Sequence, residues 1–205
     1  MEFPNYITVM RIPALIILFI AFAFKASAQQ ADTTVYDRYL DFNLARLDGD
    51  LPKAFEIGKK ILPNVDKLAP KEQISFYNSI GKVYEDSDQP DAAELYYKKV
   101  AEAMPDYYVV HRALGYIYAD RAKRLFDELN TAVADKKNEA FTKYKAEAEL
   151  AAIHLEKAQA CDPSDETLEL IKSLYTNMKD EKGLKSLNKR IKEKSKTCID
   201  ILSDQ

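Results

Sequence analysis

Two hexapeptides of the same design lie 34 residues apart in this chain. SIGKVY covers residues 79–84 and ALGYIY covers residues 113–118. Each reads as a small residue, an aliphatic, a glycine, any residue, a β-branched residue and a tyrosine. Self-similarity at a fixed period is typical of repeat proteins, in which each unit buries its apolar face only against its neighbours. The spacing therefore constrains the fold more than any other feature.

The residues around the first hexapeptide predict two antiparallel helices joined by a short turn. Apolar residues recur at helical spacing in both halves. Pro90 suits the first turn of the second helix, and Pro105 ends it. Small residues, Gly81 and Ala93, stand where the two backbones must approach closely. The apolar positions are Tyr77, Ile80, Gly81 and Tyr84 in the first helix, and Ala93, Tyr96, Tyr97, Val100 and Ala101 in the second.

This pattern resembles the tetratricopeptide repeat, a helical hairpin with a period of 34 residues. The next unit continues in register with His111, Leu114, Gly115 and Tyr118, then Ala151, Leu155, Ala158 and Pro163. The resemblance implies an all-α fold: a right-handed α-solenoid of about four stacked helical hairpins. The expected units are residues 35–69, 70–106, 107–163 and 164–203. The last is a capping pair without the glycine, with helices over residues 165–178 and 181–202.

The third unit carries an insertion. Tyr84 and Ala93 are nine residues apart, whereas Tyr118 and Ala151 are 33 apart, which adds 24 residues. Because apolar residues continue at helical spacing through the insertion, we expect both helices to be longer by roughly 18 Å, with a polar tip at residues 135–138. Such an arm either buries more apolar surface or carries its tip to a partner or a membrane.

The N-terminal residues predict export. Residues 12–24 are apolar, and Ala26-Ser27-Ala28 follows, so residues 1–28 read as a signal peptide, with Met10 as a possible true start. A retained N-terminal anchor is the alternative. Residues 29–205 are then expected to form a single helical domain, periplasmic or envelope-associated in a bacterium. In an oxidising compartment Cys161 and Cys198 either pair or stay as two separately buried thiols.

Charge and composition exclude other classes. The net charge is −3, and −4 without residues 1–28, so the basic surface needed for nucleic acid is lacking. The two histidines, His111 and His154, match no metal or catalytic motif, and no phosphate-binding loop or nucleophile elbow occurs. His111 takes the packing position of Tyr77. We expect neither enzymatic activity nor a cofactor or metal.

The resemblance also implies a concave groove that holds a peptide or a segment of another protein. Its positions fall in the first helix of each unit and combine amides, cations and aromatic rings. Part of the carboxylate-clamp pattern is present, but several of its lysines, arginines and asparagines are missing. The expected function is a protein–protein interaction scaffold or adaptor in the cell envelope. The groove residues are Tyr39, Asn43, Asn78, Lys82, Arg112 and Tyr116.

An alternative function is a membrane-surface structural protein. It would act through the inserted arm or through the basic last helix, residues 179–196, whose apolar stripe comprises Leu184, Leu187 and Ile191. A capping helix with a solvated basic face explains the same residues.

Overall fold

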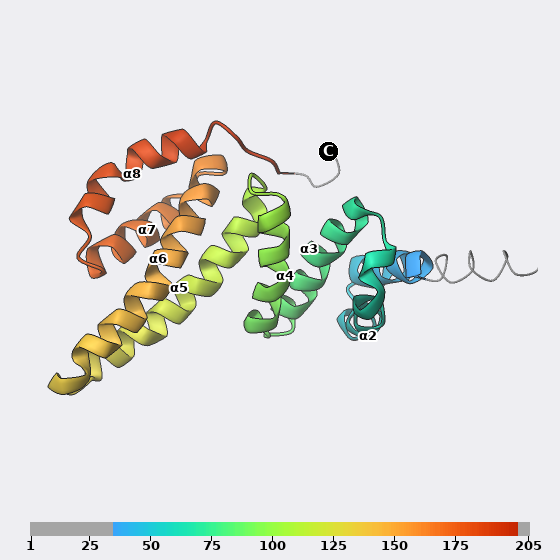
Figure 1. Cartoon of the computed structure of the whole chain (residues 1–205), viewed down its shortest axis with the longest axis horizontal. Helices are drawn as coiled ribbons and strands as arrows, with labels where there is room; N and C mark the ends of the chain where they lie inside the picture. The colour runs from blue at the N-terminus through green and yellow to red at the C-terminus, as the bar shows by residue number, and fades with distance from the viewer. Residues whose placement is uncertain (1–34, 201–205) are drawn as a thin grey trace, which may run out of the picture.

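The computed structural model describes residues 35–200, and its regular elements in that range are all helical. The all-α prediction is therefore confirmed for this part of the chain (Figure 1). The elements are a first helix over residues 35–47, α2 (Leu51–Ile61), the 3-10 helix η1 (Leu62–Lys67), α3 (Pro70–Asp86), α4 (Pro90–Ala103), α5 (Tyr108–Thr131), the 3-10 helix η2 (Ala134–Lys136), α6 (Lys137–Cys161), α7 (Asp165–Asn177) and α8 (Glu181–Lys194).

Helices that follow one another in the chain pack against one another. α3 contacts α4, α5 contacts α6 and α7 contacts α8, while α2 packs on α3, α4 on α5, and α6 on α7 and α8. Figure 1 shows this serial arrangement from the first helix to α8. Most contacts are therefore between sequence neighbours.

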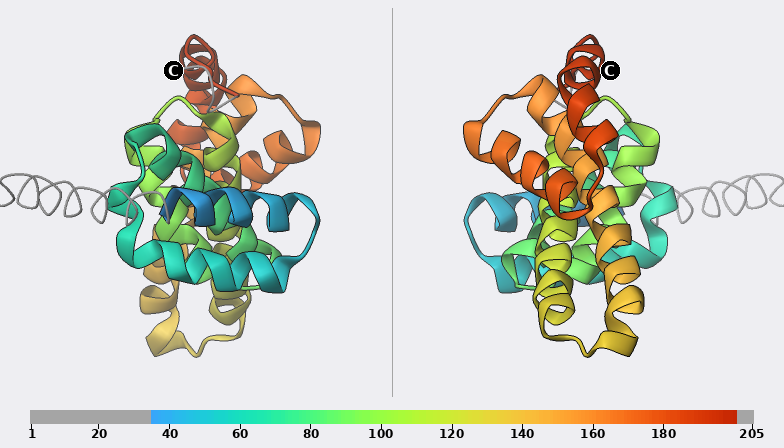
Figure 2. Two further views of the ribbon diagram at one scale, coloured as in Figure 1. Left: turned by 90° about the vertical axis from the view of Figure 1, so that its right-hand side faces the viewer. Right: turned by 90° about the vertical axis from the view of Figure 1, so that its left-hand side faces the viewer.

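The lengthening of the third helical pair is confirmed. α5 has 24 residues and α6 has 25, against 17 in α3 and 14 in α4. In both views of Figure 2 the α5–α6 hairpin projects beyond the other helices. The turn lies at residues 132–136 and not at 135–138, because Lys137 and Asn138 already belong to α6.

The glycines of the two hexapeptides occupy equivalent places. A Cβ atom at Gly81 would lie 2.7 Å from Cε1 of Tyr97 in α4. A Cβ atom at Gly115 would lie 2.6 Å from Cδ2 of Leu155 in α6 and 3.1 Å from its backbone nitrogen. Each glycine thus lets the second helix of its own pair approach more closely than an alanine would.

The alanines of the repeat pattern support the same correspondence. Ala93 and Ala151 are both fully buried. Tyr97 and Leu155, which cover the two glycines, each follow the corresponding alanine by four residues. The 34-residue period of the sequence therefore reflects a packing contact that occurs in both pairs. In the third pair the insertion separates the glycine from the alanine and leucine along the chain, but the contact is the same.

Stacked tyrosines join two clusters of buried side chains. One cluster lies under the first helix, α2 and α3, and the other extends from α4 to α8. Tyr77 and Tyr84 of α3 contact both clusters, and Tyr96 of α4 stacks on them with ring centroids 6.1 and 5.4 Å away. Burial, with Tyr84 and Tyr77 nearby, raises the pKa of Tyr96 to about 12.

Buried carboxylates fasten neighbouring pairs together. Tyr118 of α5 donates to Glu94 of α4 at 2.9 Å, and Tyr175 of α7 donates to Glu156 of α6 at 2.6 Å. Arg190 of α8 adds a forked ion pair to Glu156, with Nη2 at 2.5 Å from Oε1 and Nε at 3.0 Å from Oε2. Because Glu156 is only 2% exposed, these partners are what make its charge tolerable inside the protein.

The predicted end of the last helix is wrong. α8 stops at Lys194 and not at residue 202, because the following segment turns back to the loop between α4 and α5. There Ile199 donates its backbone N–H to Asp106 at 2.9 Å and accepts from Tyr108 at 3.1 Å. These two backbone hydrogen bonds take the place of the helical turns that were predicted after Lys194.

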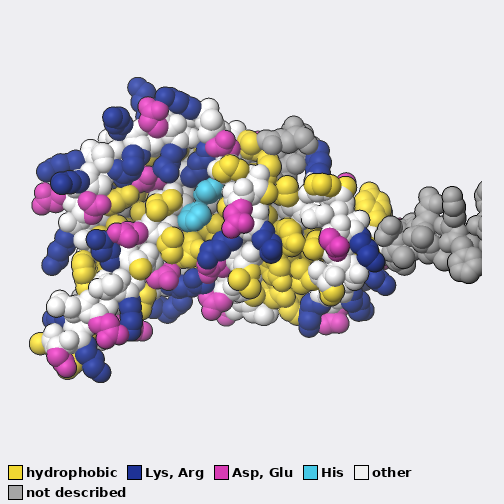
Figure 3. Space-filling model, in the orientation of Figure 1, with side chains coloured by type: hydrophobic (Ala, Val, Ile, Leu, Met, Phe, Trp, Pro, Cys, Tyr) yellow, Lys and Arg dark blue, Asp and Glu magenta, His cyan; other side chains and the backbone are white. Residues whose placement is uncertain are grey.

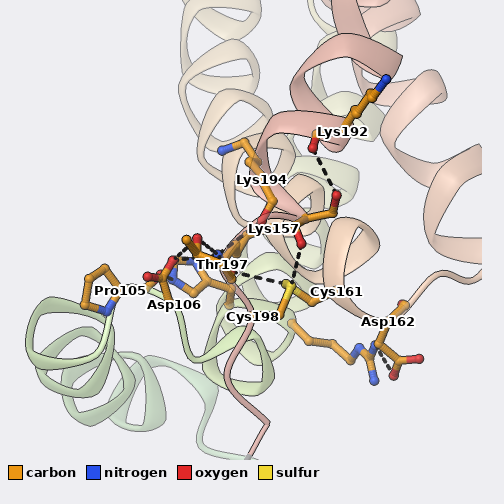
Figure 4. Close-up of a disulfide and its surroundings, with 12 residues drawn as sticks. Pro105, Asp106, Lys157, Cys161, Asp162, Lys192, Lys194, Thr197 and Cys198 are labelled. Atoms are coloured by element: carbon orange, nitrogen blue, oxygen red, sulfur yellow. Dashed lines mark hydrogen bonds and ion pairs between the residues drawn. A yellow bond between two sulfur atoms is a disulfide. The ribbon is translucent and has the colours of Figure 1, made fainter.

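A disulfide holds that segment in place. Cys161 at the end of α6 is bonded to Cys198, which settles the alternative left open by the sequence (Figure 4). One turn earlier on α6, the buried ammonium of Lys157 lies 2.7 Å from Oδ1 of Asp106 and donates to the backbone oxygen of Thr197. The end of α6, the loop before α5 and the C-terminal segment are therefore tied at one point.

Candidate binding groove between α3, α5 and α7

Four of the six predicted groove residues line one pocket. Asn78 and Lys82 come from α3, and Arg112 and Tyr116 come from α5. The pocket has a volume of about 340 Å³. Its remaining lining residues are Glu85, Tyr97, Val109 and Ala113. The structure therefore brings together residues that the 34-residue period assigned to equivalent helical faces.

The other two predicted residues lie elsewhere. Tyr39 is buried against Phe76 of α3, with ring centroids 6.4 Å apart, so it belongs to the core and does not line the pocket. Asn43 is half-buried on the first helix and also lies outside the pocket. Of these two residues, Tyr39 therefore serves packing.

The cations of this pocket already have partners. Lys82 lies 2.8 Å from Asp86, and the hydrogen bond to that carboxylate raises the pKa of Lys82. Arg112 lies 2.6 Å from Asp162 at the end of the α6 helix. An incoming carboxylate would have to compete with both aspartates. Recognition here is consequently better suited to uncharged groups such as peptide amides than to a chain-terminal carboxylate.

A second pocket adjoins the first at Tyr116. It lies between α5, α6 and α7 and has a volume of about 370 Å³. The Tyr116 hydroxyl is 3.0 Å from Oγ1 of Thr167, a hydrogen bond that links α5 to α7 beside it. Apart from Tyr116, the lining residues are Ala119, Asp120, Lys123, Phe126, Tyr144, Leu170, Ser173, Leu174 and Asn177. Sequence reasoning missed this pocket because α7 lacks the glycine pattern that marks the other pairs.

The two histidines form a pair that their sequence positions did not predict. Their Nδ1 atoms are 2.9 Å apart, across the α5–α6 contact, and Nε2 of His111 is 3.0 Å from the Pro105 carbonyl oxygen. A carbonyl only accepts, so Nε2 of His111 carries a proton. In the neutral pair, Nδ1 of His154 then donates to Nδ1 of His111. Figure 3 shows both rings reaching the surface of one face beside apolar side chains.

The pKa values of both imidazoles are lowered. Burial lowers the pKa of His111, and the nearby ammonium groups of Lys157 and Lys194 act in the same direction. Burial, then the His111 ring, lowers the pKa of His154 to about 4. α5 and α6 run antiparallel on either side of the turn at residues 132–136. His111, near the start of α5, therefore lies opposite the last turns of α6, where His154 is found. The half-buried position of His111 agrees with its predicted packing role.

Among residues 35–200, no group of three or more histidine, cysteine, aspartate or glutamate side chains is placed to hold a metal ion. Within the same range, no helix combines the length and the apolar character needed to cross a membrane. Comparisons of the chain with protein-family models, curated proteins and solved structures found no match.

Proposed function

We propose that the chain is a non-enzymatic scaffold that binds a segment of another protein in the groove between α3, α5 and α7. In this proposal the helical pairs form a right-handed solenoid of the tetratricopeptide type, and the first helices of successive pairs supply the groove. The equivalent contacts of Gly81 with Tyr97 and of Gly115 with Leu155 support the repeat.

The observation that carries the proposal is that the two pockets adjoin at Tyr116. Residues chosen for their repeat positions line the first pocket, and Tyr116 is shared with the second. A long groove with amide and aromatic side chains on helices suits an extended peptide, whose backbone can hydrogen-bond to groups such as Asn78. The side chains of the peptide would then enter the two pockets.

Export to a bacterial envelope is part of the proposal. The apolar run at residues 12–24 and the small residues after it are its basis in the sequence, and they lie outside the described residues. The disulfide between Cys161 and Cys198 supports an oxidising compartment, where such bonds persist.

Peptide selection tests the function. A displayed library of random decapeptides would be selected on the purified chain, and the affinity of an enriched peptide would be measured by fluorescence anisotropy. Tyr116→Ala is expected to weaken binding about tenfold, because it removes an aromatic contact shared by both pockets. Tyr36→Ala is the matched control, since Tyr36 is an exposed tyrosine on the first helix. Equal effects of the two variants, or no enriched peptide, would refute the proposal.

The part of the membrane alternative that acts through α8 finds less support. Leu187 is buried and Ile191 is half-buried, both packed in the core, which leaves Leu184 as the one large apolar side chain that α8 exposes. An interfacial helix needs its apolar face free for lipid. Flotation with anionic liposomes is therefore expected to show no binding through α8.

A further inference from the structure

The inserted part of the α5–α6 hairpin carries a third pocket that continues the groove. Its volume is about 670 Å³, and it shares Phe126 and Asn177 with the pocket between α5, α6 and α7. The other lining residues are Leu129, Asn130, Lys137, Asn138, Phe141, Thr176 and Lys179. Three adjoining pockets thus follow α5, and we call them the first, middle and arm pockets.

Helix α5 lines all three pockets, so its length sets the length of the groove. The groove runs from Val109 in the first pocket to Asn130 in the arm pocket. These residues span roughly 32 Å at 1.5 Å per helical residue. An extended chain covers this distance with about nine residues. The middle of the middle pocket and the middle of the arm pocket are about eight helical residues apart, or three to four extended residues.

The middle pocket has the chemistry of an anchor site. Its walls are mostly aromatic and aliphatic, and its volume is in the range of natural ligand pockets. The Tyr144 side chain is 1% exposed, and its hydroxyl has no hydrogen-bond partner at good geometry. Burial raises the pKa of Tyr144 to about 12, a rise that the Asn177 side chain opposes. Tyr144 therefore contributes its ring to the wall of the pocket, with the hydroxyl buried behind the surface.

The arm end of the groove is cationic. Lys123 lines the middle pocket, and Lys137 and Lys179 line the arm pocket. In the described part of the chain, none of these three lysines forms an ion pair, whereas Asp120, the one acidic lining residue of these two pockets, is paired with Arg124. This differs from the first pocket, where the cations are neutralised. Unpaired lysines beside amide side chains favour carboxylates.

We propose that the inserted hairpin is the specificity half of the groove, and that it selects partner segments with an aromatic or large aliphatic side chain followed three to four residues later by acidic residues. The anchor side chain fills the middle pocket, and the carboxylates meet Lys137 and Lys179 in the arm pocket. The inference rests on the proposed function, whose groove it extends. It also gives the inserted hairpin a binding role in addition to the burial of apolar surface.

Charge reversal tests the inference. The probe is a fluorescent decapeptide with phenylalanine at position 4 and aspartate or glutamate at positions 7 and 8. The variant Lys123→Glu/Lys137→Glu/Lys179→Glu is expected to bind this probe at least about tenfold more weakly and to bind a counterpart with lysines at positions 7 and 8 more tightly.

A matched control separates local from overall charge. Lys60→Glu/Lys67→Glu/Lys189→Glu changes the net charge equally at exposed lysines that line none of the three pockets. Its affinity for the acidic probe is expected to stay within about twofold of the unmodified protein, since exposed distant charges are screened by salt. Equal losses in the two triple variants would overturn the inference.

The anchor is tested separately by filling the middle pocket. Ser173→Trp places a large side chain on the exposed rim of α7, where it is expected to weaken binding of the phenylalanine probe and not of a probe with alanine at position 4. The library selection distinguishes the two proposals. Enriched peptides that need Tyr116 but carry no acidic preference would refute this inference and support the function. Absence of any enriched peptide would refute both.

Discussion

Replacing Gly115 with alanine tests whether close packing of the hairpin explains the repeated glycine. The new Cβ would lie 2.6 Å from Cδ2 and 2.7 Å from Cγ of Leu155, both too close for carbon atoms. Overpacking a core contact typically costs about 1–3 kcal/mol. Alanine in place of glycine stabilises a helix by about 1 kcal/mol. The expected net effect of Gly115→Ala is therefore a loss of up to about 2 kcal/mol.

The same substitution should change sign when Leu155 is shortened. Leu155→Ala alone is expected to cost about 2–5 kcal/mol, because Leu155 is fully buried. It also removes the two atoms that collide with a Cβ at Gly115. In that background the helix propensity of alanine dominates, so Gly115→Ala is expected to stabilise by up to about 1 kcal/mol. The coupling between the two sites would then be about 1–3 kcal/mol.

Urea denaturation followed by circular dichroism, with the disulfide intact, measures all four corners of this cycle. A sign change of the Gly115→Ala effect between the two backgrounds supports the packing explanation. If the substitution has the same effect in both backgrounds, or stabilises the unmodified protein, close packing is not the reason for the glycine.

Three further predictions concern the links between helices. Cys161→Ser/Cys198→Ser opens a loop between residues 37 apart and is expected to lower the free energy of unfolding by about 4 kcal/mol, as is reduction of the unmodified protein with dithiothreitol. The pKa of His154 is near 6.5 in the unfolded chain and about 4 in the folded chain. The free energy of unfolding should therefore fall, on the order of 3 kcal/mol, as the pH drops from 6.5 to 4. In the His154→Asn variant, the free energy of unfolding should depend less on pH in this range. Arg190→Ala leaves the buried carboxylate of Glu156 without its cation and is expected to cost about 3–5 kcal/mol in thermal or chemical unfolding, and an unchanged midpoint would contradict the buried ion pair.

The sequence predicts the packing that depends on periodic residues. The glycines and alanines of the second and third pairs recur in register because close helix contacts recur, and the insertion keeps helical spacing because both long helices need an apolar seam. The groove positions on α3 and α5 came from the resemblance to the tetratricopeptide repeat, and the four of them line one pocket.

Features that depend on contacts between distant segments are not visible in that pattern. The early end of α8 at Lys194 arises because residues 195–200 find backbone partners next to Asp106 and a thiol partner in Cys161. The His111–His154 pair depends on the antiparallel register of the long hairpin. Tyr39 lies in the core and not in the first pocket because Phe76 packs on it, a contact between neighbouring pairs that a single-unit motif does not contain.

Site-specific photo-crosslinking tests the central claim most directly. A photo-reactive phenylalanine derivative would replace Tyr116, where the first and middle pockets join, and in a second variant Leu150, an exposed residue of α6 that lines none of the three pockets. If the groove binds the peptide, an enriched peptide is expected to be covalently captured by the variant at position 116 and not by the variant at position 150. Capture at position 150 alone, or equally at both positions, would contradict a groove between α3, α5 and α7.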